Sequence, residues 1–201
     1  KLRMDSDPSK QSEQPLGNQV PEIIDISATL PRHLTKKYKK REIKDITKII
    51  VHCTDTNSSI SLEEIANWDI KGFQNIDPTG LPAITYHDMI TMDGKRFHTL
   101  PYEEVSYHAK GLNSCSIGIA LHYRVTDKKT NKDTYGPKEI ALKSLVQHLG
   151  EFCLEYIILP DQIFGHRELE GTGWEWKDGQ KSLLKTCPGL KIDLDLLRKD
   201  V

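Results

Sequence analysis

The sequence ITKIIVHC at residues 46–53 predicts the first strand of the folded domain. β-branched residues dominate it and no helical period fits, which is typical of a buried strand. Successive side chains of a strand point to opposite faces, so Ile50 and His52 share one face, whereas Ile49, Val51 and Cys53 share the other. We therefore expect that His52 and Cys53 cannot both serve one site on this strand.

Both helices and strands are predicted after this strand along the chain. Ser61 and Glu64 form a capping box that starts a helix near Leu62, and turn residues at 92–95 indicate a hairpin. Strands are expected at 84–91, 96–100, 116–123 and 162–165, and further helices from Pro137 and over 193–199. Strands interspersed with helices and at least one hairpin predict an α/β fold, with a single domain whose central mixed β-sheet is flanked by helices.

Length, charge and cysteine content exclude several classes of protein. The 201 residues suffice for one domain with a real core. Lys and Arg number 28 against 29 Asp and Glu, so the net charge of -1 gives no reason to expect nucleic acid as a partner. No apolar run approaches the roughly 20 residues of a membrane span. The four cysteines lack the spacing of a disulfide framework, so free thiols are expected.

The amino-terminal part of the chain differs in composition from the rest. Residues 1–20 are polar with almost no large apolar side chain, which predicts a disordered tail. Basic residues are concentrated at 36–41. This indicates either a solvated connector or a segment that binds an anionic surface, such as a cell envelope, by electrostatic attraction. The predicted division is a polar tail and linker at 1–41 and a folded domain at 42–201.

Three potential metal ligands stand out from the rest of the sequence. His52 and His166 each end an apolar run, and Cys187 lies in the turn-forming sequence KTCPG at 185–189. Two imidazoles and one thiolate form a three-ligand zinc set that leaves the fourth position open for water. A single histidine after an apolar run is more often a structural residue, so the hypothesis depends on the three taken together.

Five pieces of sequence occur in a fixed order: IIVHCT at 49–54, ITYHDMI at 84–90, SYHAKG with NSCSIGIAL at 106–121, FGHRE at 164–168 and KTCPG at 185–189. Together they resemble the zinc-dependent N-acetylmuramoyl-L-alanine amidases, a superfamily that includes the phage lysozyme-type amidases and the peptidoglycan recognition proteins. The resemblance covers residues 44–200. It implies zinc as the cofactor, peptidoglycan as the substrate, and a catalytic domain at 42–201.

The resemblance also implies a reaction and roles for individual residues. The bond that the resemblance implies is the amide between the lactyl group of N-acetylmuramic acid and L-alanine. Zinc suits amide hydrolysis because it lowers the pKa of water and polarises a carbonyl. Tyr86 and Lys185 would stabilise the tetrahedral oxyanion or assist proton transfer. His108 and Asn113 match the segment that lines the substrate groove. The alternatives are a packing tyrosine for Tyr86 and a surface histidine for His108.

The chain departs from the compact pattern between His166 and Cys187, where short phage members of the superfamily have only a brief loop. Trp174 and Trp176 lie in this insertion. They would stack on a sugar or peptide if the insertion forms a wall of the substrate groove. A packed surface flap is the alternative.

Three other functions stay open from the sequence alone. One is a peptidoglycan-binding module of the same fold without catalysis. Another is a metal-free thiol hydrolase that uses Cys187 and a histidine. The third is a structural zinc site, which would need a fourth protein ligand that is not evident. We expect a monomer that acts on the cell wall and is secreted, periplasmic or delivered by a phage.

Overall fold

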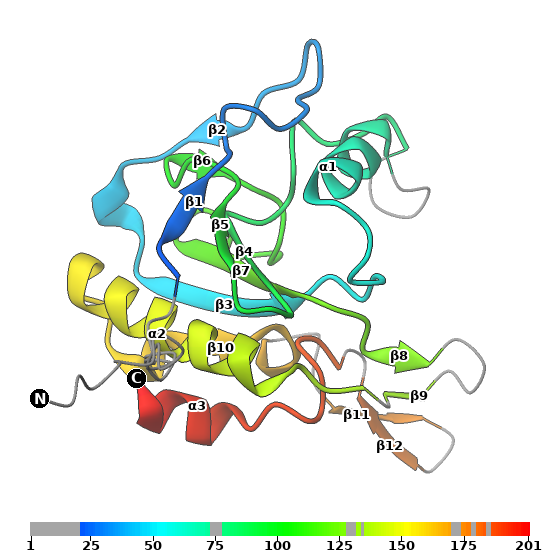
Figure 1. Cartoon of the computed structure of the whole chain (residues 1–201), viewed down its shortest axis with the longest axis vertical. Helices are drawn as coiled ribbons and strands as arrows, with labels where there is room; N and C mark the ends of the chain where they lie inside the picture. Colours follow the sequence, from blue (N-terminus) through cyan, green and yellow to red (C-terminus); the bar gives the residue numbers. More distant parts are fainter. Residues whose placement is uncertain are drawn as a thin grey trace, which may run out of the picture.

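A six-stranded mixed sheet forms the centre of the molecule (Figure 1). The computed structural model describes residues 21–72, 78–127, 132–133, 135–169, 174–177, 180–183 and 186–201. The strands in spatial order are β1 (Ile23–Asp25), β5 (Arg96–His98), β4 (Asp88–Thr91), β7 (Ser116–His122), β3 (Lys48–Cys53) and β10 (Ile163–Gly165). Only β4 and β5 pair antiparallel within this sheet. The predicted α/β fold with a central mixed sheet is therefore confirmed.

Helices cover both faces of this sheet (Figure 1). α1 (Leu62–Lys71) packs on one face, and α2 (Glu139–Tyr156) and α3 (Leu194–Asp200) pack on the other. Short elements complete the description: η1 (Ile43–Asp45), η2 (Pro160–Gln162), η3 (His166–Glu168), and the strand pairs β2 (Lys39–Lys40) with β6 (Glu104–Val105), β8 (Thr126–Asp127) with β9 (Lys132–Asp133), and β11 (Trp174–Lys177) with β12 (Gln180–Leu183). No helix in the described ranges combines the length and apolar character that a membrane crossing requires.

Alternation along β3 separates two hydrophobic cores. Ile49 and Val51 pack into the core beneath α2 and α3, together with Leu145 and Leu149 of α2. The core beneath α1 contains side chains of α1, β4 and β7, namely Ile65, Ala66, Met89 and Ala120. His52 is aligned with Ala120 of β7, so its ring lies on the α1 face, as the alternation predicts.

The predicted start of α1 is confirmed in detail. The Ser61 hydroxyl accepts the Glu64 amide N–H at 3.1 Å, and the Glu64 carboxylate accepts the Ser61 amide N–H at 3.2 Å. The helix ends at Gly72, whose φ of 95° is readily adopted only by glycine. Two of the amide groups that have no partner within the helix are thereby satisfied at its first turn.

The strand expected from Ile84 begins only at Asp88. Thr85 donates its amide N–H to the Asp69 carboxylate of α1 at 2.8 Å, so this amide is taken out of the sheet. Tyr86 consequently lies before the strand rather than within it.

Part of the amino-terminal segment before residue 42 packs on the domain. β1 pairs in parallel with β5, and Leu30 and Tyr38 are buried in the core beneath α1. Arg41 is also buried, and it donates to the carbonyl oxygens of Asn113 at 2.9 Å and Ser116 at 2.7 Å. The division at residue 42 remains an interpretation of composition, and the tail predicted at 1–20 lies outside the described residues.

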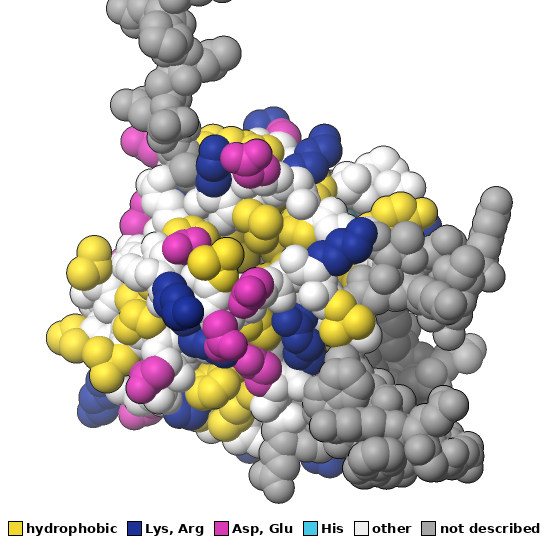
Figure 2. Space-filling view, turned by 90° about the horizontal axis from the view of Figure 1, so that it is seen from below, with side chains coloured by type: hydrophobic (Ala, Val, Ile, Leu, Met, Phe, Trp, Pro, Cys, Tyr) yellow, Lys and Arg dark blue, Asp and Glu magenta, His cyan; other side chains and the backbone are white. Residues whose placement is uncertain are grey.

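The surface in Figure 2 mixes acidic, basic and hydrophobic side chains without one dominant sign. This distribution agrees with a net charge of -1 over the whole chain.

Candidate metal centre

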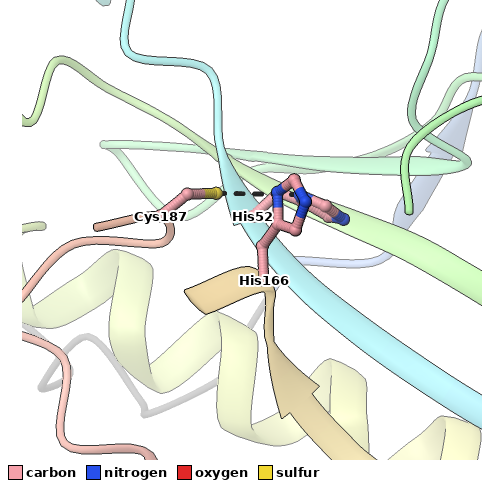
Figure 3. Close-up of side chains that lie close together, drawn as sticks. All are labelled: His52, His166 and Cys187. Carbon is pink, nitrogen blue, oxygen red and sulfur yellow. Dashed lines mark hydrogen bonds between the residues drawn. The ribbon is translucent and has the colours of Figure 1, made fainter. Parts of the chain in front are cut away.

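His52, His166 and Cys187 converge from three separate segments (Figure 3). One donor atom from each residue lies within 4.8 Å of the others. His52 comes from β3, His166 opens η3 immediately after β10, and Cys187 lies in the turn before α3. The predicted three-ligand set is therefore a cluster in space, assembled from residues up to 135 positions apart.

The sheet holds the first two members of the cluster. β3 lies between β7 and β10, so the backbone of His52 belongs to a central strand. η3 begins where β10 ends, and the Glu168 carboxylate fixes this corner by accepting the Gly165 amide N–H at 2.8 Å. Arg198 of α3 binds the same carboxylate through two donors at 2.8 and 2.9 Å. A bidentate arginine of this kind restricts the orientation of the carboxylate.

Arg167 ties the histidine corner to the cysteine turn. Its amide N–H donates to the Cys187 carbonyl oxygen at 2.8 Å, and its guanidinium binds the carbonyl oxygens of Gly189 and Ile192. The Pro188 carbonyl accepts the Tyr123 hydroxyl at 2.7 Å. The position of Cys187 relative to His166 therefore depends on direct hydrogen bonds between the two segments.

Hydrogen bonds stabilise the thiolate form of Cys187. Its pKa lies well below the usual value, chiefly because the Cys53 thiol donates a hydrogen bond, with a further contribution from His166. The Cys53 amide N–H also donates to the Cys187 sulfur at 3.2 Å. The same contact and burial raise the pKa of Cys53, which stays protonated.

This role of Cys53 corrects the expectation that His52 and Cys53 cannot both serve one site. Their side chains do leave opposite faces of β3, but Cys187 lies beyond the end of the strand and contacts both residues. All four cysteines are free thiols, as predicted.

The donor set fits zinc. Two imidazole nitrogens and one thiolate are ligands that zinc accepts in catalytic sites with an open fourth position. The Cys187 sulfur lies 3.7 Å from His52 Nδ1. Zinc bonds of about 2.3 Å to sulfur and about 2.1 Å to nitrogen at a tetrahedral angle would separate the two ligand atoms by about 3.6 Å. His52 thus presents Nδ1 to the metal position.

Tyr86 lies beside this cluster. Its ring centroid is 5.1 Å from that of His52, with the two planes tilted by 42°. Burial raises the pKa of Tyr86 well above its usual value, and the nearby Cys187 adds to the shift. The hydroxyl therefore keeps its proton and can act as a hydrogen-bond donor.

His108 and Asn113, which the sequence links to the substrate groove, make internal contacts. His108 is buried, and its Nδ1 lies 3.1 Å from His52 Nε2. Burial lowers the pKa of His108 well below its usual value, with smaller contributions from His52 and His87, so the ring is neutral. The Asn113 side-chain oxygen accepts the Ala109 amide N–H at 2.6 Å and thereby closes the loop that carries His108.

Three candidates cannot be located at the level of side chains. Lys185 lies outside the described residues. Trp174 and Trp176 lie on β11, which forms an antiparallel hairpin with β12, and only their backbone is described. Their proposed roles remain predictions.

Sequence reasoning missed Cys53, Arg41 and Ser116 as supports of the site. Arg41 holds both ends of the His108 loop through the carbonyls of Tyr102 and Ser116, each at 2.7 Å. The motif HCT places Cys53 next to His52, but strand alternation turns the two side chains to opposite faces and so hid this support. Nothing in the basic run at 36–41 separates the buried arginine from the exposed lysines around it.

Solved structures share this fold. The amidase LysC from Clostridium intestinale URNW aligns with a TM-score of 0.63 at 18% identity, covering 89% of this chain and 96% of LysC. A structure of the peptidoglycan recognition proteins LCa and LCx with bound tracheal cytotoxin aligns with a TM-score of 0.61 at 17% identity, covering 88% of this chain and 95% of the matched chain. At these identities the likeness shows the fold alone.

Sequence comparison identifies the family as well as the fold. The endolysin of Escherichia phage T7 is 31% identical over 113 residues, which are 55% of this chain and 69% of the endolysin. A family model described as N-acetylmuramoyl-L-alanine amidase matches residues 42–190 and so includes all three members of the candidate metal centre. The chain therefore belongs to the N-acetylmuramoyl-L-alanine amidase family.

Proposed function

We propose that this protein is a zinc-dependent hydrolase that cleaves the amide between N-acetylmuramic acid and L-alanine in peptidoglycan. The observation that carries the proposal is the cluster of His52, His166 and Cys187, in a chain of the amidase family. In the described part of the chain the cluster has three protein donors and no fourth, which favours a catalytic over a structural metal.

A zinc ion held by these three residues would supply Lewis acidity, which polarises the scissile carbonyl and favours ionisation of a nucleophilic water. The protein has to present neutral imidazoles and a thiolate to hold such an ion. The hydrogen bond from Cys53 supports the thiolate form of Cys187. His166 contributes in the same direction.

Tyr86 is the donor best suited to the developing oxyanion. Its protonated hydroxyl belongs to a ring that packs beside His52, and we propose that it donates to the carbonyl oxygen of a substrate bound at the cluster. A donor that acts mainly on the transition state raises turnover with little effect on ground-state binding. Lys185 would act in the same way from the turn that carries Cys187, a role that rests on the resemblance.

The β11–β12 hairpin would border the substrate groove. It follows directly after η3 in the chain and leads to the cysteine turn, so it joins two of the proposed ligands. Trp174 and Trp176 would supply stacking surface for a sugar ring or stem peptide. The partner we propose is peptidoglycan, met at the cell wall by a monomer.

A peptidoglycan-binding module without catalysis is the second candidate. It is compatible with the fold, which recognition proteins solved with bound tracheal cytotoxin also have. The presence of both histidines and the cysteine in one cluster favours the enzyme, since a binding module has no need of a metal-ligand set. A thiol hydrolase would use the same Cys187 and a histidine, but it would be insensitive to chelation.

Mass spectrometry of digested murein tests these alternatives together. The amidase is expected to release stem peptides with a free L-alanine amino terminus and glycan that keeps its lactyl group. A chelator should abolish release and added Zn²⁺ should restore it. Products that still carry a lactyl–alanine bond would contradict the proposed bond. Release that persists in chelator would indicate the thiol hydrolase, and binding without products would indicate the recognition module.

A further inference from the structure

A chain of hydrogen bonds runs from a backbone carbonyl to the metal-facing side of His52. The Ser116 hydroxyl lies 2.8 Å from the Leu112 carbonyl oxygen and 3.3 Å from His108 Nε2. His108 Nδ1 lies 3.1 Å from His52 Nε2. On the far side of the His52 ring, Nδ1 faces the Cys187 sulfur at 3.7 Å.

The chemistry of these groups favours one direction of donation along this series of hydrogen bonds. A carbonyl oxygen can only accept, so the single Ser116 hydroxyl proton goes to Leu112. The Ser116 oxygen then accepts, which places the one proton of the neutral His108 ring on Nε2. His108 Nδ1 is left with a lone pair and accepts a proton from His52 Nε2. His52 must then carry its proton on Nε2, and its Nδ1 lone pair is exposed toward Cys187.

We propose that His108 is a positioning residue that holds His52 as the Nε2–H tautomer, with Ser116 fixing His108 in turn, so that the Nδ1 lone pair of His52 is preset for a metal ion. This inference rests on the proposed metal site and deepens it. It replaces the substrate-binding role that the sequence suggested for His108. A ring that is buried and hydrogen-bonded on both nitrogens has no atom left for substrate.

The surrounding packing is built to keep this ring in place. The His108 ring lies against Gly118 of β7, where a Cβ atom would come within 2.8 Å of His108 Cγ. Any side chain at 118 would therefore push the ring off the sheet. Asn113 closes the loop by accepting the Ala109 amide, and Arg41 holds the carbonyls of Asn113 and Ser116.

The alternative arrangement reverses every proton. Ser116 would donate to His108 Nε2, His108 would donate from Nδ1, and His52 would carry its proton on Nδ1 as a donor to the thiolate. That tautomer blocks the atom that faces the metal position. The shorter contact from Ser116 to Leu112, 2.8 against 3.3 Å, favours the first direction.

NMR on the full chain tests the tautomer directly. Long-range ¹⁵N–¹H correlation should find the proton of His52 on Nε2 in both zinc-loaded and chelator-treated protein, and that of His108 on Nε2 as well. A proton on His52 Nδ1 in the metal-free protein would overturn the proposal. This measurement involves no substrate, so it is decided separately from the amidase assay and from metal content.

Zinc affinity of matched variants tests the consequence. Loss of a residue that hydrogen-bonds a metal ligand typically weakens metal binding by about 10- to 100-fold. His108→Leu should weaken Zn²⁺ binding by about that factor, whereas His108→Asn should retain most of the affinity because its amide oxygen can accept near the position of Nδ1. His122→Leu is the control, because this buried histidine bonds to the Ile60 carbonyl instead.

The outcomes separate positioning from general packing. The positioning role would be contradicted if His108→Leu and His108→Asn lost equal amounts of Zn²⁺ affinity. It would also be contradicted if the Zn²⁺ dissociation constant of His108→Leu lay within about twofold of the parent value. Ser116→Ala changes little volume, and its His108 should show a mixture of tautomers with an intermediate loss of affinity. If His108→Leu does not fold, Ser116→Ala and the parent spectrum still decide, since an unchanged His108 tautomer in Ser116→Ala refutes the directed chain.

Discussion

Asp88 is a buried carboxylate whose charge should govern the stability of this protein in acid. It lies on the α2 side of β4 and accepts hydrogen bonds from His148 Nε2 at 2.9 Å, His98 Nδ1 at 2.8 Å and the Tyr102 hydroxyl at 3.0 Å. Burial alone would raise the pKa of Asp88, but the bonds from His148 and His98 outweigh it and bring the pKa to about 2. The ionised form therefore belongs to the folded state.

The shift converts into a free energy. The ordinary pKa is 3.8 and the folded value about 2. At 1.36 kcal/mol per unit, the ionised carboxylate stabilises the fold by about 2.5 kcal/mol. A depressed pKa gives stability that is complete above the unfolded value, near pH 4, and is lost as the pH falls toward 2. Between pH 5 and pH 3 the free energy of unfolding should fall by about 1 kcal/mol from this group.

Denaturant titrations of the parent and Asp88→Asn at pH 5 and pH 3 measure this contribution. The advantage of the parent over Asp88→Asn should shrink by about 1 kcal/mol across that interval. Asp93→Asn is the control. The pKa of Asp93 is also about 2 through its bonds to Thr91 and Lys95. Asp93 lies in an exposed turn, however, where solvent screens its charge. An advantage of Asp88 that is equal at both pH values would refute a depressed pKa.

Three further predictions concern the site and the tail. Cys187→Ser should lose most of its zinc and nearly all amidase activity, whereas Cys53→Ser should keep one zinc because a hydroxyl can replace the thiol as donor; metal analysis of purified variants checks both. Lys185→Ala and Tyr86→Phe should each lower kcat on a defined muropeptide by about 10²- to 10³-fold at unchanged zinc content, and turnover above about a third of the parent would exclude the role. Removal of residues 1–19 should leave Tm and turnover on soluble muropeptide unchanged, and a large fall in Tm would show that the segment packs on the domain.

Features set by neighbouring residues in the chain could be predicted from the sequence. The capping box of Ser61 and Glu64 involves groups three residues apart, and the start of α1 follows from it. The alternation along β3 correctly places His52 on the face opposite Val51. In both cases the physical cause is local backbone geometry, so no knowledge of distant partners is needed.

Features that depend on distant partners could not be predicted in this way. Asp88 interrupts an apolar strand, which signals a buried charge, but its partner His148 lies 60 residues away on α2. The contact of Cys53 with Cys187 arises at the end of a strand, where alternation no longer separates the two faces. β1 was missed because a strand of three exposed residues has no burial pattern of its own.

The segment from His108 to Gly118 illustrates how the contacts of a matched motif can favour a role other than the one that the resemblance implies. His108, Asn113, Ser116 and Gly118 each make an internal contact. These contacts follow from one requirement, which is that the His108 ring lies flat on the sheet beside His52. Gly118 leaves the space, Ser116 binds the outer nitrogen, and Asn113 closes the loop. A substrate groove would also favour polar residues and glycine, so composition alone could not separate the two roles. We infer that substitutions in this segment change zinc affinity more strongly than they change substrate binding.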